Sequence, residues 1–157
     1  MGRGMIVAVV AIVLLVLGAA APGKAASDDG TAGVVRSAAG RASITRDGRT
    51  FPAAVGTKLR VGDVLATGPG GSLGVILRDN SILSVGPESS LTIRKFLFAP
   101  AEGKLGLLVR LTRGTLACIS GLIGKLAPES ARFETPTATI GIRGTRFAVK
   151  AGGAVSP

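Results

Sequence analysis

Three observations predict a single all-β domain, formed by short strands in a rolled double sheet or a β-solenoid-like barrel, after an N-terminal signal segment. From Val34 onward, apolar and polar residues alternate with the period of strands. The 24 glycines and 8 prolines fall mostly between the apolar runs, where they would close turns. After the N-terminal apolar run, no segment carries a helical stripe of useful length. At 157 residues, the chain has room for one modest domain.

The first 25 residues have the features of a secretory signal peptide. Arg3 is the only charge before an apolar run from Met5 to Ala21, and small residues follow. We expect cleavage after Ala25, which places Gly23 and Ala25 at the two small-residue positions. The alternative is an uncleaved membrane anchor over residues 5–21, because this run is only slightly shorter than the roughly 20 residues that span a bilayer.

The remaining boundaries follow from composition. Residues 26–33 are small or polar, and we expect a flexible leader there. The β-domain is expected over residues 34–150, and residues 151–157 are expected to form a short C-terminal tail.

The first strands are predicted to form a hairpin. The run from Arg41 to Arg46 alternates small or apolar side chains with polar ones, and Arg49–Phe51 returns after Asp47-Gly48. Asp-Gly favours a two-residue hairpin turn, because both central positions need a positive φ.

Further strands follow the same period. Leu73–Leu77 is expected to end at a second turn, Arg78–Ser81, from which Ile82–Val85 returns. Leu91–Leu97 and Leu105–Leu111 are the next candidates, and the second of them places alternate apolar residues on one face.

Weak internal repetition accompanies these strands. Arg113–Ile119 is echoed by Arg143–Val149, and Thr67-Gly68-Pro69 and Val85-Gly86-Pro87 mark similar corners. A recurring strand and glycine corner suits a solenoid or a rolled double sheet, in which neighbouring turns bury each other's apolar face. The repetition does not distinguish between these two architectures.

The chain is strongly basic. Its formal net charge of +10 falls to +8 when Arg3 and Lys24 leave with the signal. Such an excess indicates nucleic acid, acidic polymers or an anionic membrane, and in a bacterial envelope the polyanions are lipid head groups and saccharides. Alternatively, arginines on exposed strand faces keep a β-protein soluble and block edge pairing. The candidate contacts for a polyanion are Arg36, Arg41, Arg46, Arg49, Lys58 and Arg60.

Most residue types that carry enzyme chemistry are missing. The chain has no histidine, tryptophan or tyrosine and a single cysteine, Cys118, which excludes Ser-His-Asp and Cys-His sites and the usual zinc sets. We therefore expect no catalytic residue, no cofactor and no metal. Cys118 lies in an apolar stretch and is expected to be a small buried hydrophobe. Asp47 and Asp79 lie in predicted turns, where carboxylates can bond the local backbone.

Two glycine-rich stretches do not fit a nucleotide site. Gly68–Ser72 lacks the lysine and the following helix of a nucleotide loop, and Gly141–Thr145 leads into the strand-like Phe147–Val149. We expect these glycines to supply backbone conformations that other residues resist. Five phenylalanines are the only aromatic residues and do not interleave with the basic ones, so we expect no nucleic-acid partner.

The segment Thr135–Phe147, with the sequence TPTATIGIRGTRF, resembles the signature of the FecR domain family of bacterial envelope proteins. The resemblance covers about Gly33 to Lys150 and includes further motifs in the family's order: Val55–Leu59, Gly62–Gly68, Asp79–Ser81 and Val85–Ser89. The signature residues, structural or binding, are Thr135, Pro136, Ala138, Gly141, Arg143, Gly144, Thr145 and Phe147.

This resemblance implies an extracytoplasmic all-β domain that is not an enzyme. The best-known relatives are transmembrane signal transducers, in which a cytoplasmic anti-sigma segment precedes the span and the outer domain senses an outer-membrane transporter. Here only Met1–Gly4 precedes the apolar run, and Ala151–Pro157 is too short for the hairpin that usually follows the signature. Either the fold closes differently, another chain supplies the strand, or the sequence is truncated. An open edge would be a site for strand addition.

Within the signature, we expect most residues to form a corner of the fold. Ile140 and Ile142 alternate onto the core face, and Phe147 and Val149 re-enter the core. Arg143 is expected to be a buried or half-buried arginine that bonds turn carbonyls, because its planar head carries five donors. The alternative is a surface recognition residue.

These observations together predict an exported, non-enzymatic FecR-like module, periplasmic or secreted, that acts in protein interaction or sensing in the cell envelope. Its partner is expected to be an envelope protein or a wall or outer-membrane saccharide, and a membrane only if the N-terminal segment stays uncleaved. The alternative is a structural or adhesive module that binds an anionic envelope polymer through its basic surface.

Overall fold

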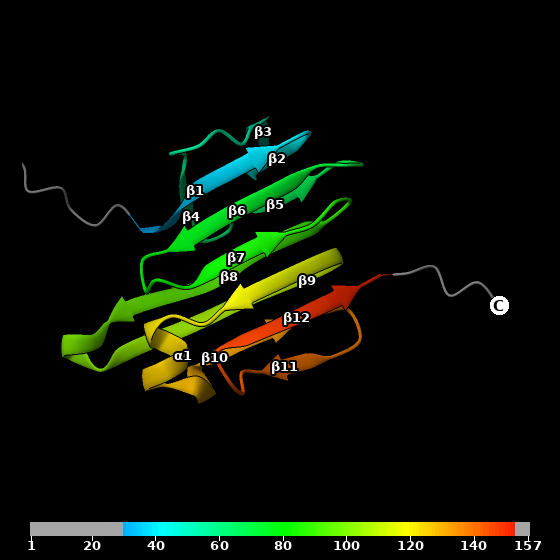
Figure 1. The fold of residues 1–157 in the computed structure, drawn as a ribbon. Helices are drawn as coiled ribbons and strands as arrows, with labels where there is room; N and C mark the ends of the chain where they lie inside the picture. The colour runs from blue at the N-terminus through cyan, green and yellow to red at the C-terminus, as the bar shows by residue number, and fades with distance from the viewer. Residues whose placement is uncertain (1–29, 153–157) are drawn as a thin grey trace, which may run out of the picture.

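The computed structural model describes residues 30–152 and confirms the all-β prediction (Figure 1). Within this range, the fold contains 12 strands, a short α-helix and two 3-10 turns. The strands are β1 (Thr31–Ala39), β2 (Ala42–Arg46), β3 (Arg49–Pro52), β4 (Lys58–Arg60), β5 (Val64–Thr67), β6 (Ser72–Leu77), β7 (Ile82–Val85), β8 (Ser90–Ala99), β9 (Lys104–Ile119), β10 (Ala131–Glu134), β11 (Thr139–Gly141) and β12 (Arg146–Ala151). The helix is α1 (Leu122–Leu126), and the 3-10 turns are η1 (Pro100–Glu102) and η2 (Pro128–Ser130).

One continuous sheet rolls into two layers, because the 16-residue strand β9 belongs to both. The first part of β9 pairs with β8 and, in parallel, with β10, and this layer continues through β5 and β2 to β3. The last part of β9 pairs with β7 and β12, and this layer continues through β6 and β1 to β4. The arrangement is the rolled double sheet of the two predicted architectures.

A change of face within β9 lets it serve both layers. Leu107 and Leu111 are buried in its first part, whereas Leu116 and Cys118 are buried in its second part, so the inward positions switch from odd to even numbers. Gly114 lies at the switch with a φ of 91°, a conformation that L-residues rarely adopt. The register with β8 shifts at the neighbouring Ser90 as well, as expected for a β-bulge.

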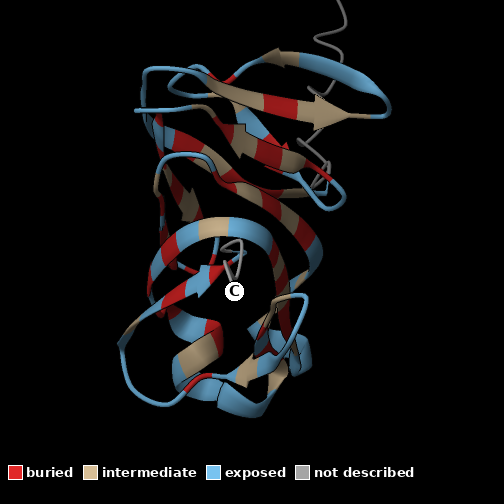
Figure 2. Cartoon of the chain, turned by 90° about the vertical axis from the view of Figure 1, so that its right-hand side faces the viewer, coloured by how far each residue is buried: buried red, intermediate tan, exposed pale blue. Residues whose placement is uncertain are grey.

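The core lies between the two layers and is formed by alternate strand residues. Figure 2 shows buried positions in red alternating along the strands with half-buried and exposed ones. Val75, Leu83, Leu91 and Val109 are each completely buried. Burying a side chain of this size contributes about 1.5–3 kcal/mol, so the core is the main source of stability.

The hairpin predicted at Asp47-Gly48 is present. Asp47 and Gly48 have φ values of 50° and 76°, and the flanking Arg46 and Arg49 pair in register between β2 and β3. The second predicted turn, around Asp79, is present between β6 and β7.

The domain boundaries differ slightly from those expected. β1 begins at Thr31, inside the predicted leader, and Ala32 is completely buried. Alanine and glycine at positions 32 and 33 conceal the strand in the sequence, although Gly33 pairs with both β4 and β6. At the other end, β12 includes Ala151, which is buried. The predicted signal or anchor (residues 1–25), the start of the leader and the tail from residue 153 lie outside the described residues.

Candidate interaction site

The first half of the signature closes the turn between β10 and β11. The Thr135 N–H donates to the Ala138 carbonyl at 2.8 Å, and the Ala138 N–H donates to Thr135 Oγ1 at 3.1 Å. Pro136 occupies the exposed corner between them. These signature residues therefore hold a local turn, as expected of a corner.

The second half of the signature ties β12 to the neighbouring elements. The Ser120 N–H, between β9 and α1, donates to the Thr145 carbonyl at 2.8 Å, and Ser120 Oγ donates to the Gly144 carbonyl at 3.4 Å. The Phe147 ring packs edge-on against Phe133 of β10, with centroids 4.6 Å apart. Such a pair adds about 0.5–1.5 kcal/mol beyond area burial. Ile142 is buried, in agreement with the core-face prediction.

Arg143 does not take the position expected of it. Its side chain is exposed, and among residues 30–152 it bonds no turn carbonyl. The loop carbonyls of Gly144 and Thr145 already accept hydrogen bonds from Ser120, which removes the need for a guanidinium there. Of the two alternatives for Arg143, the structure shows the surface position.

Asp79 is completely buried and organises the turn between β6 and β7. Its Oδ1 accepts from the Ser81 N–H at 3.0 Å, and its Oδ2 accepts from Ser81 Oγ at 2.8 Å and from the Ile123 N–H at 3.2 Å. The last of these reaches α1, 44 residues away in sequence. The predicted backbone bonding of Asp79 is confirmed, and it extends beyond the local turn.

Asp63 forms a second internal anchor, with Arg46 as its partner. Arg46 Nε donates to Asp63 Oδ1 at 2.8 Å, and Arg46 Nη2 donates to Asp63 Oδ2 at 2.6 Å and to the Lys58 carbonyl at 2.8 Å. The hydrogen bond to Asp63 raises the pKa of Arg46 above its usual value. Arg46 therefore joins β2, β4 and the turn that precedes β5.

The other five candidate polyanion contacts are exposed but lie in different places. Arg36 lies on β1 at the register shift opposite β6, whereas Arg41 and Arg49 lie at opposite ends of the β2–β3 hairpin. Lys58 and Arg60 flank the buried Leu59 on β4. The structure therefore brings Lys58 and Arg60 together with Arg46, and it does not gather all six into one surface.

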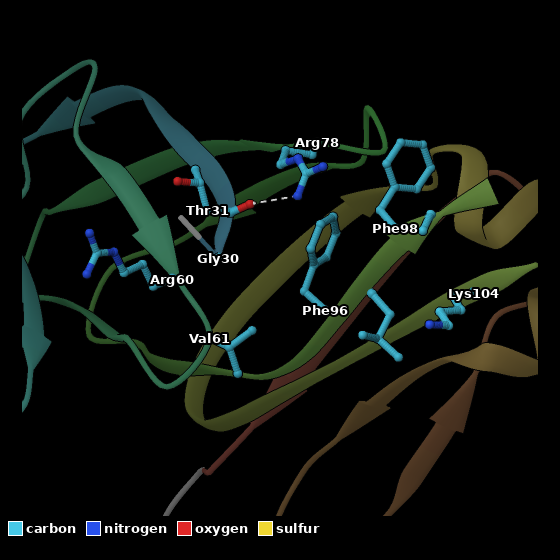
Figure 3. Close-up of a pocket in the computed structure, with 10 residues that line it drawn as sticks. Gly30, Thr31, Arg60, Val61, Arg78, Phe96, Phe98 and Lys104 are labelled. Carbon is cyan, nitrogen blue, oxygen red and sulfur yellow. Dashed lines mark hydrogen bonds between the residues drawn. The ribbon is translucent and has the colours of Figure 1, made fainter. Parts of the chain in front are cut away.

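A pocket that the sequence did not predict lies where the β8–β9 hairpin meets the start of β1 (Figure 3). This end pocket has a volume of about 440 Å³, within the range of ligand sites. It is lined by Gly30, Thr31, Arg60, Val61, Arg78, Phe96, Leu97, Phe98, Ala99 and Lys104.

The end pocket combines an apolar wall with cations. The rings of Phe96 and Phe98 lie on β8 with their centroids 6.4 Å apart, and Figure 3 shows Arg60, Arg78 and Lys104 around them. Val61 and Leu97 are 47% and 44% exposed, so two large apolar side chains of the end pocket are accessible to a partner. The consecutive apolar residues from Phe96 to Phe98 break the strand alternation, and this was the signal in the sequence for an exposed apolar site.

Arg78 and Lys104 are held in different ways at the rim of the end pocket. Arg78 Nη1 donates to the Thr31 carbonyl at 3.3 Å, which fixes the guanidinium beside the first described residues. Lys104 lies 3.4 Å from Glu102, and both side chains are largely exposed. An exposed pair of this kind is weak, so Lys104 can exchange partners at low cost.

Comparison with known proteins identifies the family. A family model described as FecR protein matches residues 63–156. The chain belongs to the FecR family. No curated protein and no solved structure matches the chain. The FecR match contains the buried Asp63 and Asp79, all of β9 and the signature, and it begins after β4.

Residues 30–152 lack both a membrane-spanning helix and a cluster of metal-ligating side chains. No helix there is long and apolar enough to cross a membrane. No group of three or more histidine, cysteine, aspartate or glutamate residues in that range could hold a metal ion.

Cys118 is a buried core residue of the FecR domain, as predicted. Its side chain is 2% exposed, and burial raises the pKa of the thiol to about 12. The reactive thiolate is therefore scarce at neutral pH.

Proposed function

We propose that this FecR protein is an exported, non-enzymatic module for protein interaction or sensing in the bacterial cell envelope. The end pocket is the observation that carries this proposal. Interface centres combine apolar or aromatic anchors with a polar rim. Phe96, Phe98 and the exposed Leu97, bordered by Arg60 and Lys104, have this composition.

The charge of the rim indicates the chemistry of the partner. Arg60 and Lys104 are exposed cations at the end pocket, and none of the lining residues within 30–152 is acidic. A protein segment with an apolar side chain next to a carboxylate fits this lining, because the side chain fills the apolar wall and the carboxylate pairs with the exposed Arg60 or Lys104. A purely saccharide partner would present only the C–H faces of its rings to Val61 and Leu97, which bury less apolar area than an apolar side chain does.

The proposal that the module is not an enzyme rests on the hydrogen bonds made by its two buried carboxylates. Asp63 and Asp79 are buried and bond backbone or arginine groups that hold the fold together. Their lone pairs are committed to structural hydrogen bonds, which leaves them poorly placed to exchange protons with a substrate.

Crosslinking in cells tests the interaction. A photo-reactive residue replaces Leu97 in one strain and Val55 in another, since Val55 is 69% exposed and lies between β3 and β4, apart from the end pocket. We expect a discrete protein adduct from position 97 and none from position 55. Equal adducts from both positions, or none from either, would refute a binding role for the pocket, and an adduct to saccharide alone would support the polymer-binding alternative.

Fractionation and intact mass test export. A soluble envelope species shortened by the predicted signal of residues 1–25 is the expected result. Full-length protein in the membrane fraction would show that residues 5–21 form an uncleaved anchor. Full-length protein in the cytosol would refute the proposal.

A further inference from the structure

β12 is the longest of the edge strands in the described sheet. Within residues 30–152 it pairs only with β9, and its other side has no strand partner. It has six residues, whereas the edge strands β3, β4 and β11 have four, three and three. β3 also ends in Pro52, and β12 contains no proline. A long edge without proline presents unpaired N–H and C=O groups to another strand.

The two faces of β12 differ in chemistry. Phe147, Val149 and Ala151 face the core and are half-buried or buried. Arg146, Ala148 and Lys150 face outward and are exposed. In a strand added at this edge, the side chains facing the core would lie beside the apolar residues of β12. The outward side chains would lie beside Arg146 and Lys150.

Self-pairing of this edge is electrostatically unfavourable. Antiparallel pairing of two copies about Ala148 would place Arg146 of one copy opposite Lys150 of the other, because these residues are equally spaced from Ala148. A parallel, in-register pair would place each cation opposite its own copy. Like charges directly opposite one another destabilise a pair of strands, so charge complementarity selects an acidic partner.

We propose that the free edge of β12 accepts an extended, acidic segment of a partner protein as an added strand. The segment alternates apolar residues facing the core with outward residues, and it carries acids four positions apart, opposite Arg146 and Lys150. Main-chain hydrogen bonds supply the affinity, and the charge spacing supplies selectivity. This site is independent of the end pocket.

Tethered test strands examine the proposal directly. A nine-residue strand of alternating valine and threonine is joined to the C-terminus of the full mature chain by a flexible Gly/Ser linker, which gives an effective concentration of roughly millimolar. In one version, glutamates occupy the two outward positions four residues apart, and in the other lysines occupy them. Amide hydrogen exchange of the labelled protein is followed by NMR.

We expect alternate amides of β12 to exchange more slowly when the glutamate strand is attached. Their protection factors should be about fivefold higher than with the lysine strand, because two exposed charge pairs stabilise the added strand by about that factor. The double variant Arg146→Glu/Lys150→Glu should reverse this preference. The matched control Arg49→Glu, on edge strand β3, should leave it unchanged.

Three results would overturn the proposal: protection that is equal for the two strands, protection that appears at β3, β4 or β11 instead, or no protection in β12. None of these results bears on crosslinking at Leu97, so failure of strand addition is distinguishable from failure of the proposed function.

Discussion

Replacing Asp79 by alanine should destabilise the domain strongly. The change removes the acceptor for the N–H and Oγ of Ser81 and for the Ile123 N–H, in a region where Asp79 is completely buried. Each lost hydrogen bond to a charged acceptor costs about 1.5–3 kcal/mol, and relief of the desolvation of a buried carboxylate offsets part of the sum. We expect a net loss of about 3–5 kcal/mol, against a total stability of roughly 5–15 kcal/mol for a typical domain.

Urea denaturation followed by circular dichroism measures this loss, since the chain has no tryptophan or tyrosine to report by fluorescence. The matched control is Asp47→Asn, in an exposed turn with a φ of 50°. Asparagine adopts that conformation readily, so stability should change by no more than about 0.5 kcal/mol. A loss below about 1 kcal/mol for Asp79→Ala would show that the link between the β6–β7 turn and α1 contributes little.

Three further predictions use the same preparation. Gly48→Ala should lower the free energy of unfolding by about 1–2 kcal/mol, because alanine would have to adopt the left-handed conformation that Gly48 has, with a φ of 76°. An unchanged urea midpoint would contradict this. Phe133→Ala should lower it by about 3–5 kcal/mol through loss of a buried ring, again measured with urea. Iodoacetamide at pH 8 should label Cys118 only after unfolding, because a thiol with a pKa of about 12 is almost entirely protonated at that pH. The labelling rate should therefore rise with pH. Rapid labelling of the folded protein at pH 8, detected by intact mass, would contradict the burial of Cys118.

The sequence predicts the strands well where both period and turn chemistry are visible. The hairpin around Asp47-Gly48 forms with positive φ at both positions, and the strands on either side of Asp79 pair as expected. In these segments, local preferences agree with the final sheet, so a short window contains the information that determines the structure.

The sequence conceals structure where small residues replace the alternating pattern. The start of β1 at Thr31 has only alanine and glycine before Val34, and these residues do not distinguish a strand from a leader. The double membership of β9 is hidden for a related reason, because Gly114 resembles a turn glycine and instead changes the face of a continuing strand. Both features depend on long-range pairing, which local propensity does not encode.

The candidate sites were harder to predict than the fold. The end pocket draws Arg60, Arg78 and Phe96 from separate strands or turns, so no short motif contains it. The exposed edge of β12 depends on which strands remain unpaired after the sheet has rolled. Only the consecutive apolar residues from Phe96 to Phe98 gave a local indication, because successive strand residues point to opposite faces and such a run places apolar side chains on both.

The family signature and the candidate binding residues also obey different constraints. Thr135 and Ala138 bond each other, while Gly144 and Thr145 accept from Ser120, so replacing them would disturb the turns that position β12. Such residues hold the fold of this FecR domain. Arg146 and Lys150 on β12 and Lys104 at the end pocket are exposed, and within residues 30–152 their side chains bond no turn carbonyl. If the two proposals hold, we therefore expect substitutions at these exposed positions to alter partner binding without unfolding the domain, because the signature holds the strand edge in place.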